Sequence, residues 1–320
     1  MNQKMKKSFL VASLLCGAGL VLFLICLFGT GFDFAKMSNV TYETNTHEIS
    51  ETFADIKVDV STADVCLVPA DTTSCKVVCK ETNQLKHSVK VENGTLVIHE
   101  VDERRFVNFI GFTFESPSVT IYLPKEEYSR LDVKGNTGDV NVPAQFRFNQ
   151  AKVEVDTGDI KWSAPVTTTL ELKTDTGDVT VSNVVTEALT VKTSTGDATI
   201  TTATVSGALS VKSSTGDMKI TDTQCKTMRA DSNTGDVKLK NTVASDLADV
   251  TNDTGDVILN GFDSAYITIK TDTGDVEGTV LSEKTFFAES DTGDVEVPRT
   301  ISEEICEITT DTGDIEVKVK

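Results

Sequence analysis

LTVKTSTGDATI, residues Leu189–Ile200, shows the pattern that occupies most of this chain. Leu189, Val191 and Thr193 alternate with polar residues, which predicts a strand with one buried face. The Thr-Gly-Asp that follows predicts a tight corner, because glycine takes positive φ angles at no steric cost. Apolar-polar alternation resumes at Ala198, so the segment predicts a strand, a corner and a second strand, followed by a looser return.

Thr-Gly-Asp recurs ten times from residue 136 onward, at intervals of 19 or 20 residues. A period near 20 is typical of a solenoid, in which each repeat is one coil and neighbouring coils bury each other's apolar faces. The residue before each Thr is Asp, Asn or Ser, whose side chains bond nearby backbone N–H groups in turns. We expect structural corners at Gly138, Gly158, Gly177, Gly196, Gly216, Gly235, Gly255, Gly274, Gly293 and Gly313.

The predicted fold class is all-β: a parallel β-solenoid (β-helix) of about ten 19–20-residue coils with an N-terminal β cap, preceded by one transmembrane helix. Within the stack, the repeated Thr174, Thr193, Thr271 and Thr310 are expected to form hydroxyl ladders. The cap is predicted to contain a decayed corner at Ser61–Val65 and a hairpin with an Asn93-Gly94 turn.

Residues 9–28 (FLVASLLCGAGLVLFLICLF) contain no charged side chain and are long enough to cross a bilayer as a helix. Lys4, Lys6 and Lys7 precede them, which predicts a cytoplasmic N-terminus and a C-terminal domain outside the cell membrane. A cleaved signal peptide is the alternative, although its apolar region is usually shorter.

These features divide the chain into five segments. They are a cytoplasmic tail (1–8), a transmembrane anchor (9–28), a tether (29–50), a β-rich N-terminal cap (51–128) and the Thr-Gly-Asp solenoid (129–320).

The formal net charge is −19, and an acidic surface excludes nucleic acid as a partner. The seven cysteines are irregularly spaced and do not form a disulfide framework. Cys66 could reach Cys75 or Cys79 across a hairpin, but buried free thiols are the favoured interpretation.

The aspartates of the repeat are expected to lie one above another, about 4.8 Å apart. Backbone N–H groups and threonine hydroxyls are the favoured means of offsetting their repulsion. Calcium is the alternative, because carboxylate oxygens suit a hard cation. We predict no other cofactor, and no metal site is assigned beyond these weak calcium candidates: Asp139, Asp159, Asp178, Asp197, Asp217, Asp236, Asp256, Asp275, Asp294 and Asp314.

Catalytic residues are not predicted. The three histidines (His47, His87 and His99) lie outside the repeats, and no arginine recurs with the repeat. A serine or cysteine nucleophile paired with a base cannot be proposed from this pattern. The sequence therefore predicts a protein that is not an enzyme.

A β-rich segment ending in Tyr122-Leu123-Pro124, followed by L-x-V-x-T-x-T-G-D-V repeats, resembles the bacterial putative-adhesin family. The resemblance covers nearly all of residues 51–320. It implies a repetitive β-strand fold and an envelope-facing bacterial protein, in a family of unknown function. It provides no functional residues to carry over.

The sequence thus favours an extracytoplasmic protein with an adhesive or structural role at the bacterial cell envelope. The expected partners are the membrane, through the N-terminal helix, and a cell-wall polymer or envelope protein, with end-to-end self-association as a further prediction. Two alternatives stay open: a regulatory ectodomain that binds a membrane partner in envelope-stress signalling, and a carbohydrate-active β-helix enzyme.

Overall fold

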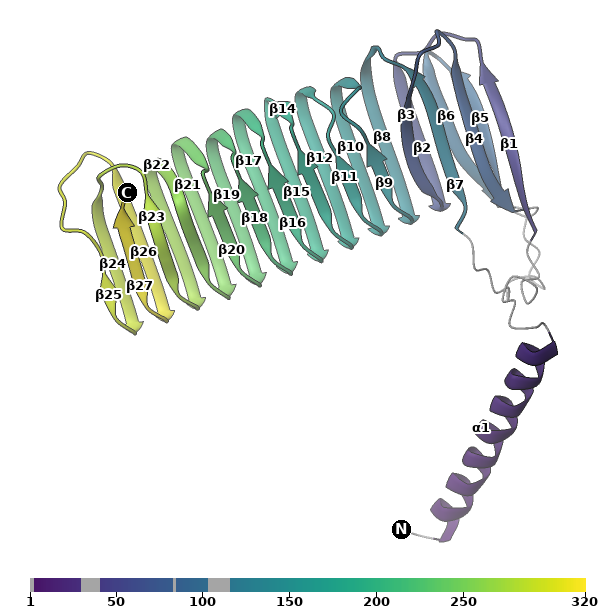
Figure 1. The fold of residues 1–320 in the computed structure, drawn as a ribbon, viewed down its shortest axis with the longest axis horizontal. Helices are drawn as coiled ribbons and strands as arrows, with labels where there is room; N and C mark the ends of the chain where they lie inside the picture. The colour runs from purple at the N-terminus through teal and green to yellow at the C-terminus, as the bar shows by residue number, and fades with distance from the viewer. Residues whose placement is uncertain (1–2, 30–40, 83–84, 103–115) are drawn as a thin grey trace.

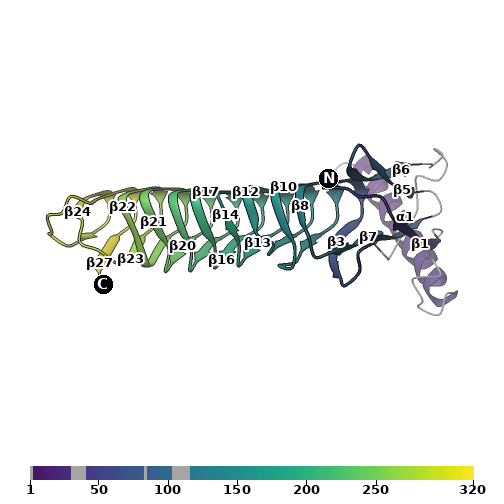
Figure 2. The ribbon, with the colours of Figure 1, turned by 90° about the horizontal axis from the view of Figure 1, so that it is seen from above.

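A computed structural model describes residues 3–29, 41–82, 85–102 and 116–320. The described residues from 55 to 320 wind into a parallel β-solenoid of about ten turns, as the repeat predicts (Figure 1). Each coil contributes one long strand and one short strand. The two resulting sheets face each other across the core (Figure 2).

The long-strand sheet contains one strand from every coil. In spatial order it comprises β5 (Leu85–Glu92), β6 (Thr95–Asp102), β2 (Asp55–Thr62), β8 (Glu127–Thr137), β10 (Arg147–Thr157), β12 (Val166–Thr176), β15 (Ala188–Thr195), β17 (Thr204–Thr215), β19 (Gln224–Thr234), β21 (Val243–Thr254), β22 (Val257–Thr273), β26 (Ile305–Thr312) and β24 (Thr285–Thr292). The two-residue strand β14 (Val185–Thr186) pairs beside it with β17.

The short-strand sheet lies opposite. It comprises β1 (Tyr42–Ile49), β4 (Cys75–Thr82), β7 (Ser118–Pro124), β3 (Asp64–Ala70), β9 (Val140–Val142), β11 (Ile160–Trp162), β13 (Val179–Ser182), β16 (Ala198–Thr201), β18 (Met218–Thr221), β20 (Val237–Lys240), the first residues of β22, β23 (Val276–Val280), β27 (Ile315–Val319) and β25 (Val295–Glu296).

In-register stacking places like residues above one another in the core. Leu170, Leu189 and Leu209 are consecutive partners in the long-strand sheet, and all three are buried. Burying a side chain of this size stabilises the fold by roughly 1.5–3 kcal/mol. Larger rings fill the first coils, where Phe148 packs between Tyr128 and Trp162. The core therefore forms one continuous column of side chains along the solenoid.

The threonines of the predicted hydroxyl ladder are aligned as partners in neighbouring strands. Thr174 pairs with Thr193 and Thr271 with Thr310, and all four are buried. The hydroxyls of Thr174, Thr193 and Thr310 do not bond to one another. Each donates instead to a glycine carbonyl of the neighbouring coil, at 3.0–3.3 Å.

A second tight corner replaces the expected looser return in five consecutive coils. Its residues adopt the left-handed conformation, with φ between 47° and 67°: Asn183, Thr202, Asp222, Asn241 and Gly261. Asn, Asp and Gly tolerate this conformation, whereas a β-branched threonine is strained there. The sequence prediction missed this corner because no single residue type marks it.

The last repeat does not form the last coil. β26 lies between β22 and β24, and β27 lies between β23 and β25. The coil of residues 305–319 is therefore inserted between two coils that come before it in the sequence. The fully buried Lys284 links the segments around this inserted coil. Its Nζ lies 2.6 Å from Asp263 Oδ1, 2.7 Å from Glu304 Oε2 and 2.9 Å from Ser282 Oγ.

The N-terminal region is a modified continuation of the solenoid. β2 and β3 form a coil whose strands pair in parallel with β8 and β9, as the decayed corner at Ser61–Val65 predicts. β5 and β6 form the predicted hairpin, with positive φ at Asn93 and Gly94. Beyond this coil the pairing includes antiparallel strands, and the antiparallel pairs β1–β4 and β5–β6 lie at the end of the stack (Figure 1).

Two segments differ from the predicted division. Tyr42–Ile49, expected within the tether, form the strand β1, because Asn45, His47 and Ile49 face inward between exposed neighbours and pair along β4. Residues 3–29 form the helix α1 (Gln3–Gly29), which begins within the expected tail. The aromatic-rich stretch at residues 105–114 lies outside the described residues.

The predicted transmembrane helix over residues 9–28 is not confirmed. Among the residues that the structure describes, no helix combines the length and the apolar character that a membrane span requires.

The strained second corner leads to a stability prediction. Thr202 is exposed with φ 56°, so Thr202→Asn should stabilise the protein by about 0.5–1 kcal/mol, because asparagine adopts this conformation more readily. The free energy of unfolding of the full chain in detergent measures the effect. Thr204→Asn, at an exposed strand position two residues later, is the matched control and should give no gain. Equal effects at both positions would contradict the assignment of strain.

Candidate functional site: the Thr-Gly-Asp corner

The corner is built around glycines that no other residue can replace. All ten have positive φ, from 125° to 154°. A Cβ at Gly235 would lie 2.3 Å from the carbonyl oxygen of Gly216 in the preceding coil. Real Cβ atoms do not approach backbone so closely, so the close approach of adjacent coils at this corner requires glycine there.

A backbone hydrogen bond accompanies this contact at each corner. The N–H of Gly158 donates to the carbonyl of Thr176 in the next coil at 2.8 Å, and every other corner except the one at Gly293, in the terminal coil, repeats this bond. The N–H of the following aspartate then needs its own acceptor, because a buried or crowded N–H without one destabilises the fold.

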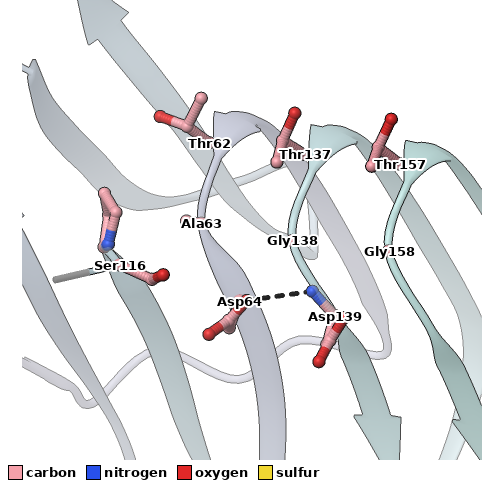
Figure 3. A pocket seen from close by; sticks show the side chains of 10 residues that line it. Thr62, Ala63, Asp64, Ser116, Thr137, Gly138, Asp139, Thr157 and Gly158 are labelled. Carbon is pink, nitrogen blue, oxygen red and sulfur yellow. Dashed lines mark hydrogen bonds between the residues drawn. The ribbon is translucent and has the colours of Figure 1, made fainter. Parts of the chain in front are cut away.

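The aspartate column supplies that acceptor. In ten successive corners, the backbone N–H of one aspartate donates to Oδ1 of the aspartate in the adjacent coil, at 2.8–3.1 Å. Figure 3 shows the first of these bonds, from Asp139 to Asp64. The column includes Asp64, which the sequence prediction did not count, and it places Asp314 between Asp275 and Asp294.

Several contacts offset the repulsion between these carboxylates. Lys238 Nζ lies 2.9 Å from Asp236 Oδ2 and 3.6 Å from Asp217 Oδ2, so it neutralises two neighbours at once. The bonds from Lys238 and from the N–H of Asp256 lower the pKa of Asp236 below its ordinary value. Hydrogen bonding by backbone N–H is the arrangement favoured by the sequence analysis. Calcium binding by the column stays a prediction.

A shallow hollow lies where the column meets the N-terminal region (Figure 3). Its volume is about 530 Å³. Ala63 lies there at the position where the next coils have glycine. The hollow is lined by Thr62, Ala63, Asp64, Ser116, Pro117, Thr137, Gly138, Asp139, Thr157 and Gly158. Small side chains and backbone dominate this lining, and Asp64 and Asp139 are the ionisable groups among its described residues. Those residues contain no nucleophile paired with a base.

The described cysteines are free thiols, and no disulfide joins Cys66 to Cys75 or Cys79. Burial raises the pKa of Cys75, Cys79, Cys225 and Cys306 to about 12. These thiols are therefore neutral at physiological pH and are poor nucleophiles.

One group of ionisable side chains escaped the sequence analysis. Cys79, Glu81 and His87 are all buried and lie together in the N-terminal region. They sit on two strands in opposite sheets, and their spacing in sequence matches no familiar ligand motif. Only the spacing Cys79-x-Glu81, which places both side chains on one face of a strand, hinted at the pair.

The repeat and its corners agree with a family model, which matches residues 53–224 and 207–320. The chain belongs to the Toastrack DUF4097 family. Together these matches span the whole solenoid, including the coil formed by β2 and β3. No curated protein matches the chain.

Several solved structures are similar to this chain at low sequence identity. A putative adhesin from Bacteroides fragilis is 14% identical with a TM-score of 0.40, covering 86% of this chain and 97% of its own. A putative adhesin from Parabacteroides distasonis is 11% identical with a TM-score of 0.43, covering 88% and 98%. A putative lipid binding protein from Parabacteroides distasonis is 16% identical with a TM-score of 0.42, covering 86% and 97%.

The hydrogen bonding of the column predicts how substitutions at one aspartate will differ. Asp197 Oδ1 accepts the N–H of Asp217 at 2.8 Å, so Asp197→Ala should destabilise the protein by about 1 kcal/mol through the lost acceptor. Asp197→Asn keeps an acceptor oxygen and removes a like charge, so its free energy of unfolding should stay near that of the wild type. If asparagine proved as harmful as alanine, the charge would be the required feature, and a bound cation would become the better explanation.

Proposed function

We propose that this protein is a non-enzymatic repeat protein of the bacterial cell envelope that binds an anionic cell-wall polymer through the outer face of its long-strand sheet. The observation that carries the proposal is a column of three lysines on that face. Lys173, Lys192 and Lys212 are consecutive partners in parallel strands, at the usual strand spacing of about 4.8 Å.

Like charges placed directly opposite one another destabilise a sheet, so such a column needs a reason. Lys173 lies 3.0 Å from Glu154 Oε1 and 3.6 Å from Asp175 Oδ1, whereas exposed Lys192 and Lys212 form no ion pair with the described residues. In a chain of net charge −19, Lys192 and Lys212 are therefore a small cationic patch, bounded along the column by the paired Lys173 and by Asp231, the strand partner of Lys212. Repeated anionic groups of a polymer would contact it at several points, and many weak contacts give a high overall affinity.

Membrane anchoring and an extracytoplasmic location are part of the same proposal. They rest on the sequence: the uncharged segment of residues 9–28 and the lysines that precede it. The similar solved structures described as adhesins suggest the same cellular role for this chain. A regulatory ectodomain in envelope-stress signalling is the alternative if no polymer binds. The carbohydrate-active enzyme remains an alternative without a supporting site in the described residues.

Co-sedimentation of the detergent-solubilised full chain with isolated bacterial cell walls tests the proposal. We expect saturable binding that weakens as salt increases, because the contact is electrostatic. Lys192→Gln combined with Lys212→Gln should reduce it several-fold. Lys270→Gln is the matched control, since Lys270 is exposed on the same sheet between Thr251 and Thr309.

Absence of binding, or equal binding by the double variant and the control, would contradict the role of the lysine column. Repeating the co-sedimentation with a chelator distinguishes binding through the aspartate column from binding through the lysine column. Loss of binding in chelator would indicate that calcium on the aspartates is required.

The C-terminal end of the stack favours a second proposal, the association of two copies end to end. β24 and β25 form the terminal coil, and Phe287, Val295, Leu281 and Ile301 around it are exposed apolar residues. The edge strand β24 can pair with the same strand of another copy. Analytical ultracentrifugation of the full chain in detergent should show a dimer, and Phe287→Glu with Val295→Glu should leave a monomer. A wild-type monomer at high concentration would contradict the proposal.

A further inference from the structure

The buried Cys79, Glu81 and His87 cluster lies near the N-terminal end of the solenoid, between the two sheets. Cys79 and Glu81 occupy alternate positions on the inward face of β4 in the short-strand sheet. His87 faces inward from β5, in the long-strand sheet. Their exposed fractions are 0%, 2% and 5%, so an acidic and an imidazole side chain, which normally contact water, are enclosed together with a thiol.

Glu81 is held firmly in place. Its Oε2 accepts the backbone N–H of His87 at 2.6 Å and lies 2.8 Å from His87 Nδ1. Its Oε1 accepts Asn45 Nδ2 at 2.5 Å, with Lys86 Nζ at 3.9 Å. Lys86 is nearer to Glu43, at 2.8 Å, so it neutralises Glu81 only in part. A carboxylate has about four acceptor positions, and one is left for a further partner.

His87 Nε2 is the feature that these contacts do not explain. It is buried, and it has no hydrogen-bond partner among the described residues. When Nδ1 carries the proton and donates to Glu81, Nε2 presents an unused lone pair. When Nε2 carries a proton, that donor is unused. Both tautomers therefore leave a buried polar atom unsatisfied, which destabilises the fold. Nδ1, on the edge of the ring that faces Glu81, is the nitrogen placed to share a ligand with that carboxylate.

We propose that Cys79, Glu81 and His87 bind a divalent transition-metal ion of the zinc type. A sulfur of Cys79, a carboxylate oxygen of Glu81 and a ring nitrogen of His87 all lie within 4.8 Å of one another. Tetrahedral zinc with ordinary bond lengths separates such ligands by roughly 3.3–3.6 Å, so side-chain shifts of about 1 Å would complete the site.

The donor set selects the class of ion. Sulfur and imidazole are ligands that zinc prefers, whereas calcium requires six or more oxygens. A water molecule is expected to fill the fourth position.

Such a site would have a structural consequence. The ion would join β4 of one sheet to β5 of the other, close to the end of the stack where the core meets solvent. The cap would then be fastened across the core as well as along its strands, and metal binding would contribute directly to its stability.

Metal binding to the full chain in detergent tests the proposal. After removal of metal with a chelator, addition of zinc should raise the melting temperature and bind one equivalent with high affinity. Cobalt in place of zinc should produce a thiolate-to-metal charge-transfer band. Cys79→Ser and His87→Gln should each weaken binding by at least about 100-fold and abolish the band. His99→Gln is the control and should retain both, because His99 lies on the outer face of β6.

Three outcomes would overturn the proposal: no zinc binding by the wild type, binding without a thiolate band, or binding unchanged in the double variant Cys79→Ser with His87→Gln. The last would assign the zinc to the surface aspartates. An excess of calcium distinguishes the sites further, since it should displace zinc from aspartates and leave the cysteine site occupied. Circular dichroism of the metal-free variants establishes that they are folded.

Discussion

Contact between the backbones of successive corner glycines is the constraint on which this solenoid depends. At Gly235 the coils approach so closely that a single Cβ would overlap the carbonyl of Gly216. That approach brings the aspartate of one coil within reach of the next aspartate N–H, and it places the glycine carbonyl over the buried Thr174-type hydroxyls. Turn, column and ladder are therefore consequences of one backbone geometry, repeated about every 20 residues.

The sequence predicts the features that repeat and misses those that occur once. The corner glycines, the parallel coils and the threonine register follow directly from the period, because each depends only on local spacing. The corner at Thr202 was missed because several residue types can adopt its conformation. The strand at Tyr42–Ile49 was missed because its inward positions include Asn45 and His47, which do not produce apolar alternation.

Features that depend on how the strands pair and how the sheets face each other could not be predicted from the sequence, for a different reason. The insertion of β26 between β22 and β24 leaves the repeat period unchanged, so no spacing reveals it. Cys79 and His87 meet only because two sheets close over a common core. Lys192 and Lys212 each lie four residues before a corner glycine, so the repeat does align them, but the sequence prediction followed only the Thr-Gly-Asp positions. The candidate sites in this molecule therefore arise from stacking rather than from motifs.

The insertion of the last repeat has a consequence for biosynthesis. A simple solenoid can add coils in the order in which the ribosome delivers them, each new strand pairing with the one before. Here β24 and β25 emerge before β26 and β27, yet their partners in the stack are those later strands. Residues 285–296 therefore have no native strand partner until residues 305–319 have been made. Native folding of this coil is thus delayed until then, and loss of residues 305–319 would remove an interior coil and leave its neighbour without a partner.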